Sequence, residues 1–265
     1  MNFKKIIQTF VITAITALGF GTIAPTAQAT SNKPIVVGSK ALTESKTVSE
    51  IYALALEHAG FHVICRQNIA NSVVYKATKS GQLDVYPEYT GTIVEAYNKK
   101  NGSGKTVKQM AALAKKEANK DGLTTFNYAP GDNRQGVGIR TSVAKKYHIK
   151  NLSDLQNQAH KIRLASQGEF EKRSDALPGM NKTYGKLATK QFTLVKDNKG
   201  LWPPYNLVPV ANKKTAKANP KMRKVLNRVD KKLTAKQLIK LNKKVSVDGK
   251  NYKTVARNWY NSHLK

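Results

Sequence analysis

The run GQLDVYPEYTGT at residues 81–92 sets the pattern of the chain around it. A glycine ends the short helix that periodicity predicts over 72–79, and residues 83–86 then form a predicted strand. Pro87 follows directly. Because proline has no N–H to donate, we expect this strand not to continue as a central strand of a sheet. A new helix is predicted over 90–97.

Upstream of this run, the pattern is strand, helix, strand. Residues 35–39 (IVVGS) predict a buried strand that ends in a glycine turn. Residues 43–60 predict a helix, with Thr43 as its cap and Gly60 at its end. The next strand is predicted over 61–66. A strand–helix–strand unit of this kind is typical of an α/β sheet.

Beyond residues 126–133, the alternation of strands and helices begins again. This second stretch predicts strands at 137–139 and 162–165, and helices at 141–147 and 153–159. From about residue 219 the chain is predicted to be helical and is very basic. The sequence therefore indicates two α/β lobes.

The N-terminal residues have the features of a secretory signal. Two lysines precede a mostly apolar run at 6–20, and Ala-Gln-Ala at 27–29 provides a cleavage site. We expect residues 1–29 to be a signal peptide and the protein to be exported, extracellular or associated with the cell surface; an uncleaved anchor is the alternative. No cysteine of the lipoprotein type ends this segment. The lone cysteine, Cys65, excludes an intrachain disulfide and is expected to be half-buried in a strand.

The chain carries a net charge of +30, most of it near its C-terminal end. Residues 186–265 contain 21 basic and three acidic residues, a net charge of +18. Such a field attracts polyanions. No nucleic-acid-binding motif accompanies the charge, so we expect contact with anionic cell-wall polymers and none with nucleic acid.

The sequence contains no arrangement of residues that indicates catalysis. It lacks a Ser/His/Asp order, a metal-spaced pair of histidines and a glycine-rich phosphate loop. The five histidines are scattered. We therefore expect no enzymatic activity, no cofactor and no bound metal.

Several longer motifs together resemble one known family. They are GSK at 38–40 followed by TE at 43–44, the run at 81–92, the residues around 169–179, DNKGLWPPY at 197–205, and VDGK at 247–250. These motifs are similar to those of the substrate-binding proteins of ABC importers for glycine betaine, choline and carnitine. The resemblance covers nearly all of the chain after residue 29.

This resemblance implies a type II periplasmic-binding-protein fold, in which two α/β lobes joined by a hinge close over a ligand. The crossings between lobes would lie near 126–133 and 194–205. The expected divisions are 1–29 (signal), 30–127 (first part of lobe 1), 128–193 (lobe 2) and 194–265 (return crossing and remainder of lobe 1). The family carries a further helix and strand where this chain has only KLATKQ at 186–191, so we expect a shortened second lobe.

A quaternary ammonium group has no N–H, so a protein holds it with aromatic faces. A ligand carboxylate needs cations and hydrogen-bond donors. By resemblance, Tyr89 and Tyr205 match tyrosines of the family's aromatic cage. Thr92 and Lys40 match groups near the ligand carboxylate, and Arg173 matches a basic residue of the second lobe.

One position departs from the family pattern. Gln135 stands where the family often has a further cage tyrosine; it can hydrogen-bond but offers no π face. The resemblance implies capture of glycine betaine, choline or carnitine and delivery to an ABC permease. The alternative is a scaffold that has lost its ligand and serves as a basic surface protein.

Overall fold

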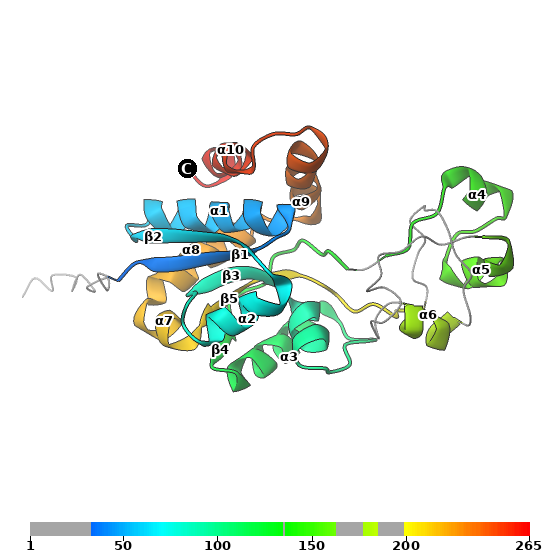
Figure 1. Cartoon of the computed structure of the whole chain (residues 1–265), viewed down its shortest axis with the longest axis horizontal. Helices are drawn as coiled ribbons and strands as arrows, with labels where there is room; N and C mark the ends of the chain where they lie inside the picture. The colour runs from blue at the N-terminus through cyan, green and yellow to red at the C-terminus, as the bar shows by residue number, and fades with distance from the viewer. Residues whose placement is uncertain (1–32, 135, 163–176, 185–198) are drawn as a thin grey trace, which may run out of the picture. The chain divides into compact units, whose positions relative to one another are not determined.

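Five strands form one sheet in the part of the chain that the structure describes, in the order β2-β1-β3-β5-β4 (Figure 1). The structure is a computed structural model and describes residues 33–134, 136–162, 177–184 and 199–265. Residues Ser31–Lys265 form one compact unit. The strands are β1 (Ile35–Lys40), β2 (Val63–Ile69), β3 (Val85–Tyr89), β4 (Leu123–Thr125) and β5 (Leu207–Asn212).

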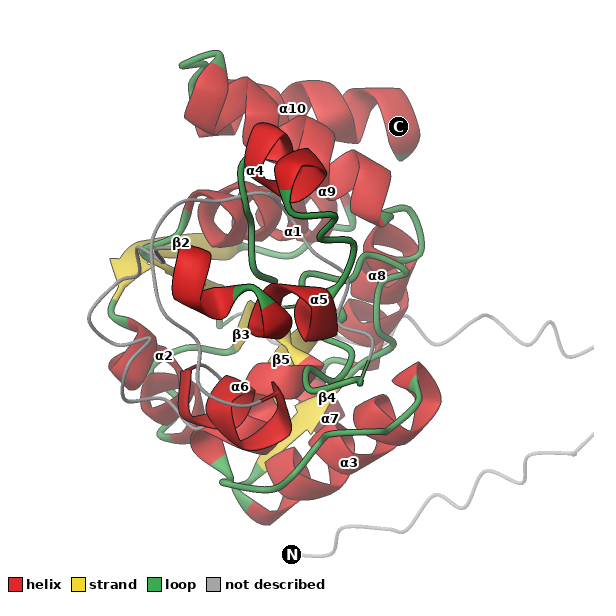
Figure 2. Ribbon diagram, turned by 90° about the vertical axis from the view of Figure 1, so that its right-hand side faces the viewer, coloured by secondary structure: helices red, strands yellow, loops and turns green. Residues whose placement is uncertain are grey.

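Helices account for most of the remaining described residues (Figure 2). The α-helices are α1 (Thr43–His58), α2 (Asn71–Lys79), α3 (Val107–Lys120), α4 (Thr141–Lys146), α5 (Leu152–Asn157), α6 (Leu177–Tyr184), α7 (Lys213–Ala218), α8 (Pro220–Asp230), α9 (Ala235–Asn242) and α10 (Tyr252–His263). The other helical segments are η1 (Thr92–Tyr97) and η4 (Lys243–Val247), both π-helical, and the 3₁₀ turn η2 (Ala159–Lys161).

The sheet combines strands from the beginning and the end of the chain. Strand β1 is parallel to β2 and β3, whereas β5 runs antiparallel to both β3 and β4. All residues of β3 and β5 are buried, as expected for strands covered on both faces. Strand β5 therefore joins the C-terminal part of the chain to the middle of the sheet.

The prediction that Pro87 would end a central strand is wrong, because Pro87 lies within β3 and faces Pro209 of β5. The Pro209 carbonyl accepts a hydrogen bond from the Phe126 N–H, 3.1 Å away, so the donor that Pro209 lacks also falls on the β4 side. The donor that Pro87 lacks falls on the β1 side, where β1 pairs with β3 only at Val37 and Val85. Neither proline removes a hydrogen bond between β3 and β5.

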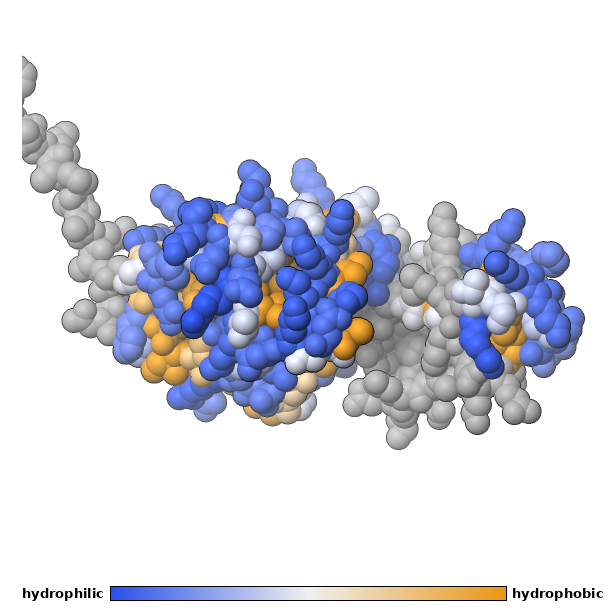
Figure 3. Space-filling view, turned by 90° about the horizontal axis from the view of Figure 1, so that it is seen from above, coloured by the Kyte–Doolittle hydropathy of each residue, from blue (hydrophilic) through white to orange (hydrophobic). Residues whose placement is uncertain are grey.

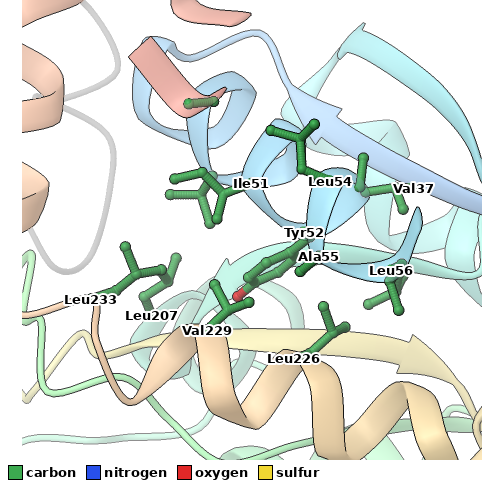
Figure 4. Close-up of a cluster of buried hydrophobic side chains, with 14 of the residues drawn as sticks. Val37, Ile51, Tyr52, Leu54, Ala55, Leu56, Leu207, Leu226, Val229 and Leu233 are labelled. Atoms are coloured by element: carbon green, nitrogen blue, oxygen red, sulfur yellow. The ribbon is translucent and has the colours of Figure 1, made fainter. Parts of the chain in front are cut away.

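Two hydrophobic clusters pack against the sheet. The first joins α1 to α8, α9 and α10, with Ile51, Tyr52 and Leu56 fully buried (Figure 4). The second joins the sheet to α2, η1 and α3. Alternate residues of β5 enter different clusters, Leu207 the first and Val208 the second, so the clusters lie on opposite faces of the sheet.

The ends of α1 differ in how well they were predicted. Thr43 does not cap the helix: the cap position belongs to Leu42, without a side-chain hydrogen bond. The end of the helix before Gly60 is confirmed. Gly60 has φ of +88°, which a glycine adopts without steric cost, and the Phe61 N–H closes the turn on the Leu56 carbonyl at 3.0 Å.

Residues 137–162 and 177–184 contribute to a third hydrophobic cluster, which also includes Trp202. Helices α4 and α5 match their predictions closely. No strand forms at 137–139, where only Val137 makes an isolated bridge. The strand expected at 162–165 lies outside the described residues beyond Ile162. Cys65 lies in β2 as predicted but is exposed rather than half-buried.

None of the helices within the described ranges has both the length and the apolar character needed to cross a bilayer.

Candidate ligand-binding site

Two distant segments meet at the end of β3. The Thr90 N–H donates to the Asn206 carbonyl at 3.0 Å, and the Asn206 N–H donates to the Thr90 hydroxyl at 3.2 Å. That hydroxyl donates in turn to the Pro204 carbonyl, 3.1 Å away. These bonds bring Tyr89 and Tyr205, both predicted to bind ligand, to the same end of the sheet.

A third segment lies alongside the second. The Asn133 N–H donates to the Tyr205 carbonyl at 3.0 Å, and the Tyr205 N–H donates to the Asp132 carboxylate at 3.0 Å. Asp132 and Asn206 form an antiparallel bridge. The two segments in which crossings were expected thus lie side by side.

The ring of Tyr89 is held through its hydroxyl, which donates to the Glu44 carboxylate. Glu44 lies in the first turn of α1, where the helix dipole favours a negative charge. It also accepts hydrogen bonds from the Asn133 amide, at 3.3 Å, and from the Asn242 amide. Burial, and next the charge of Glu44, raise the pKa of Tyr89 well above its usual value, so its hydroxyl remains a donor.

Tyr205 is held in the same way by a different acid. Its hydroxyl donates to the Glu95 carboxylate of η1 at 2.6 Å, and the residue is buried. The ring packs directly on Gly91, since a Cβ atom there would lie 2.2 Å from Cε2 of Tyr205. Only glycine at position 91 allows the ring this close approach.

Lys40 forms a buried ion pair with Glu88. Their side chains are 5% and 0% exposed. Glu88 also accepts hydrogen bonds from the Tyr86 and Tyr97 hydroxyls and from the Tyr89 N–H, each at 2.9 Å. The Lys40 ammonium lies 5.8 Å from the centre of the Tyr89 ring and 6.0 Å from that of Tyr97, within the range of cation–π attraction.

The other expected ligand contacts are less fully placed. Thr92 begins η1 and is half-buried, and its side chain makes no hydrogen bond to another described residue. Gln135 and Arg173 lie outside the described residues. Of the six predicted side chains, the structure thus brings Lys40, Tyr89 and Tyr205 into one region of buried tyrosines and carboxylates.

Sequence reasoning missed the acids that hold these side chains. Glu44 and Glu88 are both part of the family motifs, but those motifs do not indicate what the two carboxylates bind. For Glu88, the tyrosines on either side of it in Tyr86-Pro87-Glu88-Tyr89 were the available signal. Asn242 is 198 residues from Glu44, and no local pattern connects them.

No group of three or more potential metal ligands gathers anywhere in the described ranges. The acids of the site instead accept hydrogen bonds from tyrosine hydroxyls and asparagine amides or pair with lysine. This arrangement holds aromatic rings in a fixed orientation beside negative charge.

Comparison with known proteins identifies the family of this chain. A family model described as the substrate-binding domain of ABC-type glycine betaine transport systems matches residues 33–193 and 182–262. The glycine betaine-binding protein YehZ of Escherichia coli is 28% identical over 85% of this chain and 89% of its own length. The carnitine transport binding protein OpuCC of Listeria monocytogenes is 24% identical over 93% of this chain and 92% of its own.

Solved structures show the same fold. A crystal structure of a glycine betaine/carnitine/choline ABC transporter protein has a TM-score of 0.74 with 20% identity, covering 86% of this chain and 98% of the other. The expected type II periplasmic-binding fold is thereby confirmed. Proteins of this family bind solutes and are not enzymes. Because the family model matches most of this chain, the chain belongs to the OpuAC family, the substrate-binding domains of ABC-type glycine betaine transport systems.

Proposed function

We propose that this protein captures a quaternary ammonium osmoprotectant (glycine betaine, choline or carnitine) outside the cytoplasm and delivers it to an ABC permease. Membership of the family supports solute capture, and the relatives named for glycine betaine and carnitine support the ligand class. The observation that carries the proposal is the pair of tyrosines, Tyr89 and Tyr205, each held by a carboxylate at one end of the sheet.

The chemistry of these pairs suits a cation that cannot donate hydrogen bonds. A trimethylammonium group is attracted to the negative face of an aromatic ring. A hydroxyl that donates to a carboxylate places further negative charge beside the ring. Glu44 is bonded only to neutral donors in the described structure, namely Tyr89, Asn133 and Asn242, so its charge adds to this attraction.

Contact with a ligand requires some movement of the surrounding chain. Tyr89 is 8% exposed and Tyr205 is 5% exposed, so neither ring face is open to solvent. Tyr205 lies on one of the two adjacent crossing segments, and domains of this kind open and close at such crossings. We assign the ligand to the conformation in which this movement uncovers the two rings.

The carboxylate of glycine betaine or carnitine needs its own partners. We assign Thr92 and Arg173 to this end of the ligand, and Gln135 to the position of a cage tyrosine, where it can hydrogen-bond to the ligand. Lys40 already has an anionic partner in Glu88, so we give it a supporting role: its ion pair fixes the end of β3 from which Tyr89 projects. No cofactor takes part.

The divisions of the chain and the shortened second lobe are also part of the proposal. The alignment with the Escherichia coli relative spans 272 positions but only 85% of this 265-residue chain, so the relative has stretches without a counterpart here. The family model matches in two pieces that meet at residues 182–193. The first observation supports a deletion, and the second supports its position near 186–191. Export through a signal at 1–29 agrees with the function of a solute receptor.

Isothermal titration calorimetry tests this function. Residues 31–265 would be titrated with glycine betaine, choline and carnitine, with folding checked by circular dichroism. We expect binding of at least one ligand, weakened about tenfold or more by Tyr89→Leu or Tyr205→Leu. Tyr128→Leu is the matched control, because Tyr128 is exposed and outside the site. A folded protein that binds none of the three would refute solute capture and favour the basic surface protein.

A further inference from the structure

Helix α9 continues without a break into η4, giving one helical segment over residues 235–247. Its inner side is apolar: Leu238 and Leu241 are buried in the first hydrophobic cluster, and Val245 packs against that cluster. On the same side, the Asn242 amide donates to Glu44. The segment is thereby fixed to the body that carries the proposed ligand site.

The outer side carries two strongly exposed apolar residues. Ile239 is 68% exposed and Val247 is 74% exposed, the highest values among the large hydrophobic residues of the described chain. A step of four residues is slightly more than one turn of an α-helix, which has about 3.6 residues per turn. The same step is slightly less than one turn of the wider π-helix. The step from 239 to 247 therefore amounts to about two turns, and both side chains lie on one face.

Lysines surround these two apolar residues. Residues 231–250 contain seven lysines and one acid, Asp248. Lys236 lies about one turn before Ile239, Lys240 lies next to Ile239 in the chain, and both lysines are exposed. Lys243, by contrast, forms an ion pair with Asp248 at 2.6 Å. The space-filling view from the α9–α10 side shows apolar patches among hydrophilic side chains (Figure 3). We call Lys236, Ile239, Lys240 and Val247 the α9–η4 face.

We propose that the α9–η4 face binds the surface of a bilayer that contains anionic phospholipids. A basic helix with apolar residues on the same exposed side suits the boundary between headgroups and acyl chains. The lysines attract anionic headgroups, and Ile239 and Val247 enter the apolar layer. A soluble polyanion would use the lysines alone and would leave both apolar residues in water. Such binding would hold the receptor beside a membrane permease, but the inference does not depend on the identity of the solute.

Vesicle co-sedimentation of residues 31–265 tests this surface. The vesicles would be phosphatidylcholine, either pure or with about one-third phosphatidylglycerol. We expect binding to the anionic vesicles alone. Because each lysine near an anionic surface changes partition about fivefold, Lys236→Gln with Lys240→Gln should weaken binding about 30-fold. Ile239→Ser with Val247→Ser should weaken it about tenfold without any change in charge.

Two double variants serve as controls. Lys115→Gln with Lys116→Gln removes the same charge from exposed positions of α3, and Ile64→Ser with Val73→Ser removes exposed apolar side chains elsewhere. Both should bind like the parent, within about twofold. The inference is overturned if the parent fails to sediment with anionic vesicles, or if each double variant of the face binds like its control.

A second measurement separates the bilayer from a soluble polyanion. Polyphosphate binding would be measured for the parent and the Ile239→Ser, Val247→Ser variant. We expect the two proteins to bind polyphosphate equally while differing on vesicles. If the serine variant keeps full affinity for vesicles and polyphosphate competes with them completely, the face is a polyanion surface and the bilayer assignment is wrong.

Discussion

Replacing Lys40 with methionine would leave the Glu88 carboxylate buried without its cation. Neither side chain of this pair is open to solvent, so water cannot take over the role of the missing partner. Glu88 would keep hydrogen bonds from Tyr86, Tyr97 and the Tyr89 N–H. Breaking a buried ion pair costs about 3–5 kcal/mol, and because these donors remain, we expect Lys40→Met to cost about 3 kcal/mol.

The complementary change should cost at least as much. Glu88→Gln leaves the Lys40 ammonium buried with no other anionic partner in the described structure, so we expect a loss of about 3–5 kcal/mol. The double variant contains no unpaired buried charge. Its loss should therefore be smaller than the sum of the two single losses by about 2 kcal/mol or more.

Urea unfolding at about 25 °C would measure these free energies by linear extrapolation. The matched control is Lys79→Met, which breaks the exposed ion pair with Asp121 and should cost less than about 1 kcal/mol. The reasoning is refuted if Lys40→Met costs no more than Lys79→Met, or if the losses of the two single variants simply add. Abolished ligand binding with unchanged stability would return Lys40 to the ligand carboxylate.

Three further predictions concern other contacts. Gly91→Ala places a Cβ 2.2 Å from the Tyr205 ring, so it should cost about 1–3 kcal/mol in urea unfolding and weaken ligand binding; unchanged stability would show that the ring is free to move. Asn242→Ala removes a donor to buried Glu44 and should cost about 1–3 kcal/mol, whereas Asn258→Ala on the exposed side of α10 should cost little; equal losses would contradict the role of Glu44. Burial raises the pKa of Asp230 well above its usual value, so its contribution to stability is full below the unfolded pKa of about 3.9 and is lost as pH rises through the folded pKa. Urea midpoints measured from low to neutral pH should therefore fall more for the parent than for Asp230→Asn, and parallel curves would show that Asp230 does not titrate in this way.

The local elements of the fold could be predicted because their causes are local. The apolar run of β1, the periodicity of α1 and the turn at Gly60 are all visible in short stretches of sequence. Pro87 was misjudged because its effect depends on a partner: opposite Pro209 its missing donor removes no hydrogen bond from the sheet. The strand expected near Val137 likewise needed pairing that its own residues do not reveal.

The candidate site was predictable only in part, for a related reason. Family motifs indicated Tyr89 and Tyr205, and the structure brings both to one end of the sheet. Some residues that hydrogen-bond to the acids beside these tyrosines come from far along the chain; the Asn242 amide, for example, donates to Glu44. Burial also changes the role expected for Lys40. A surface lysine could bind a ligand carboxylate freely, whereas Lys40 is already paired with Glu88.

A crystal structure of residues 31–265 with bound ligand would test the central claim most directly. If titration finds choline, carnitine or glycine betaine to bind, that complex should place the trimethylammonium group within about 6 Å of the ring centres of Tyr89 and Tyr205. Tyr89 should still donate to Glu44, and Lys40 should remain on Glu88. A ligand bound away from both rings, or a Lys40 that leaves Glu88 for the ligand carboxylate, would contradict the account.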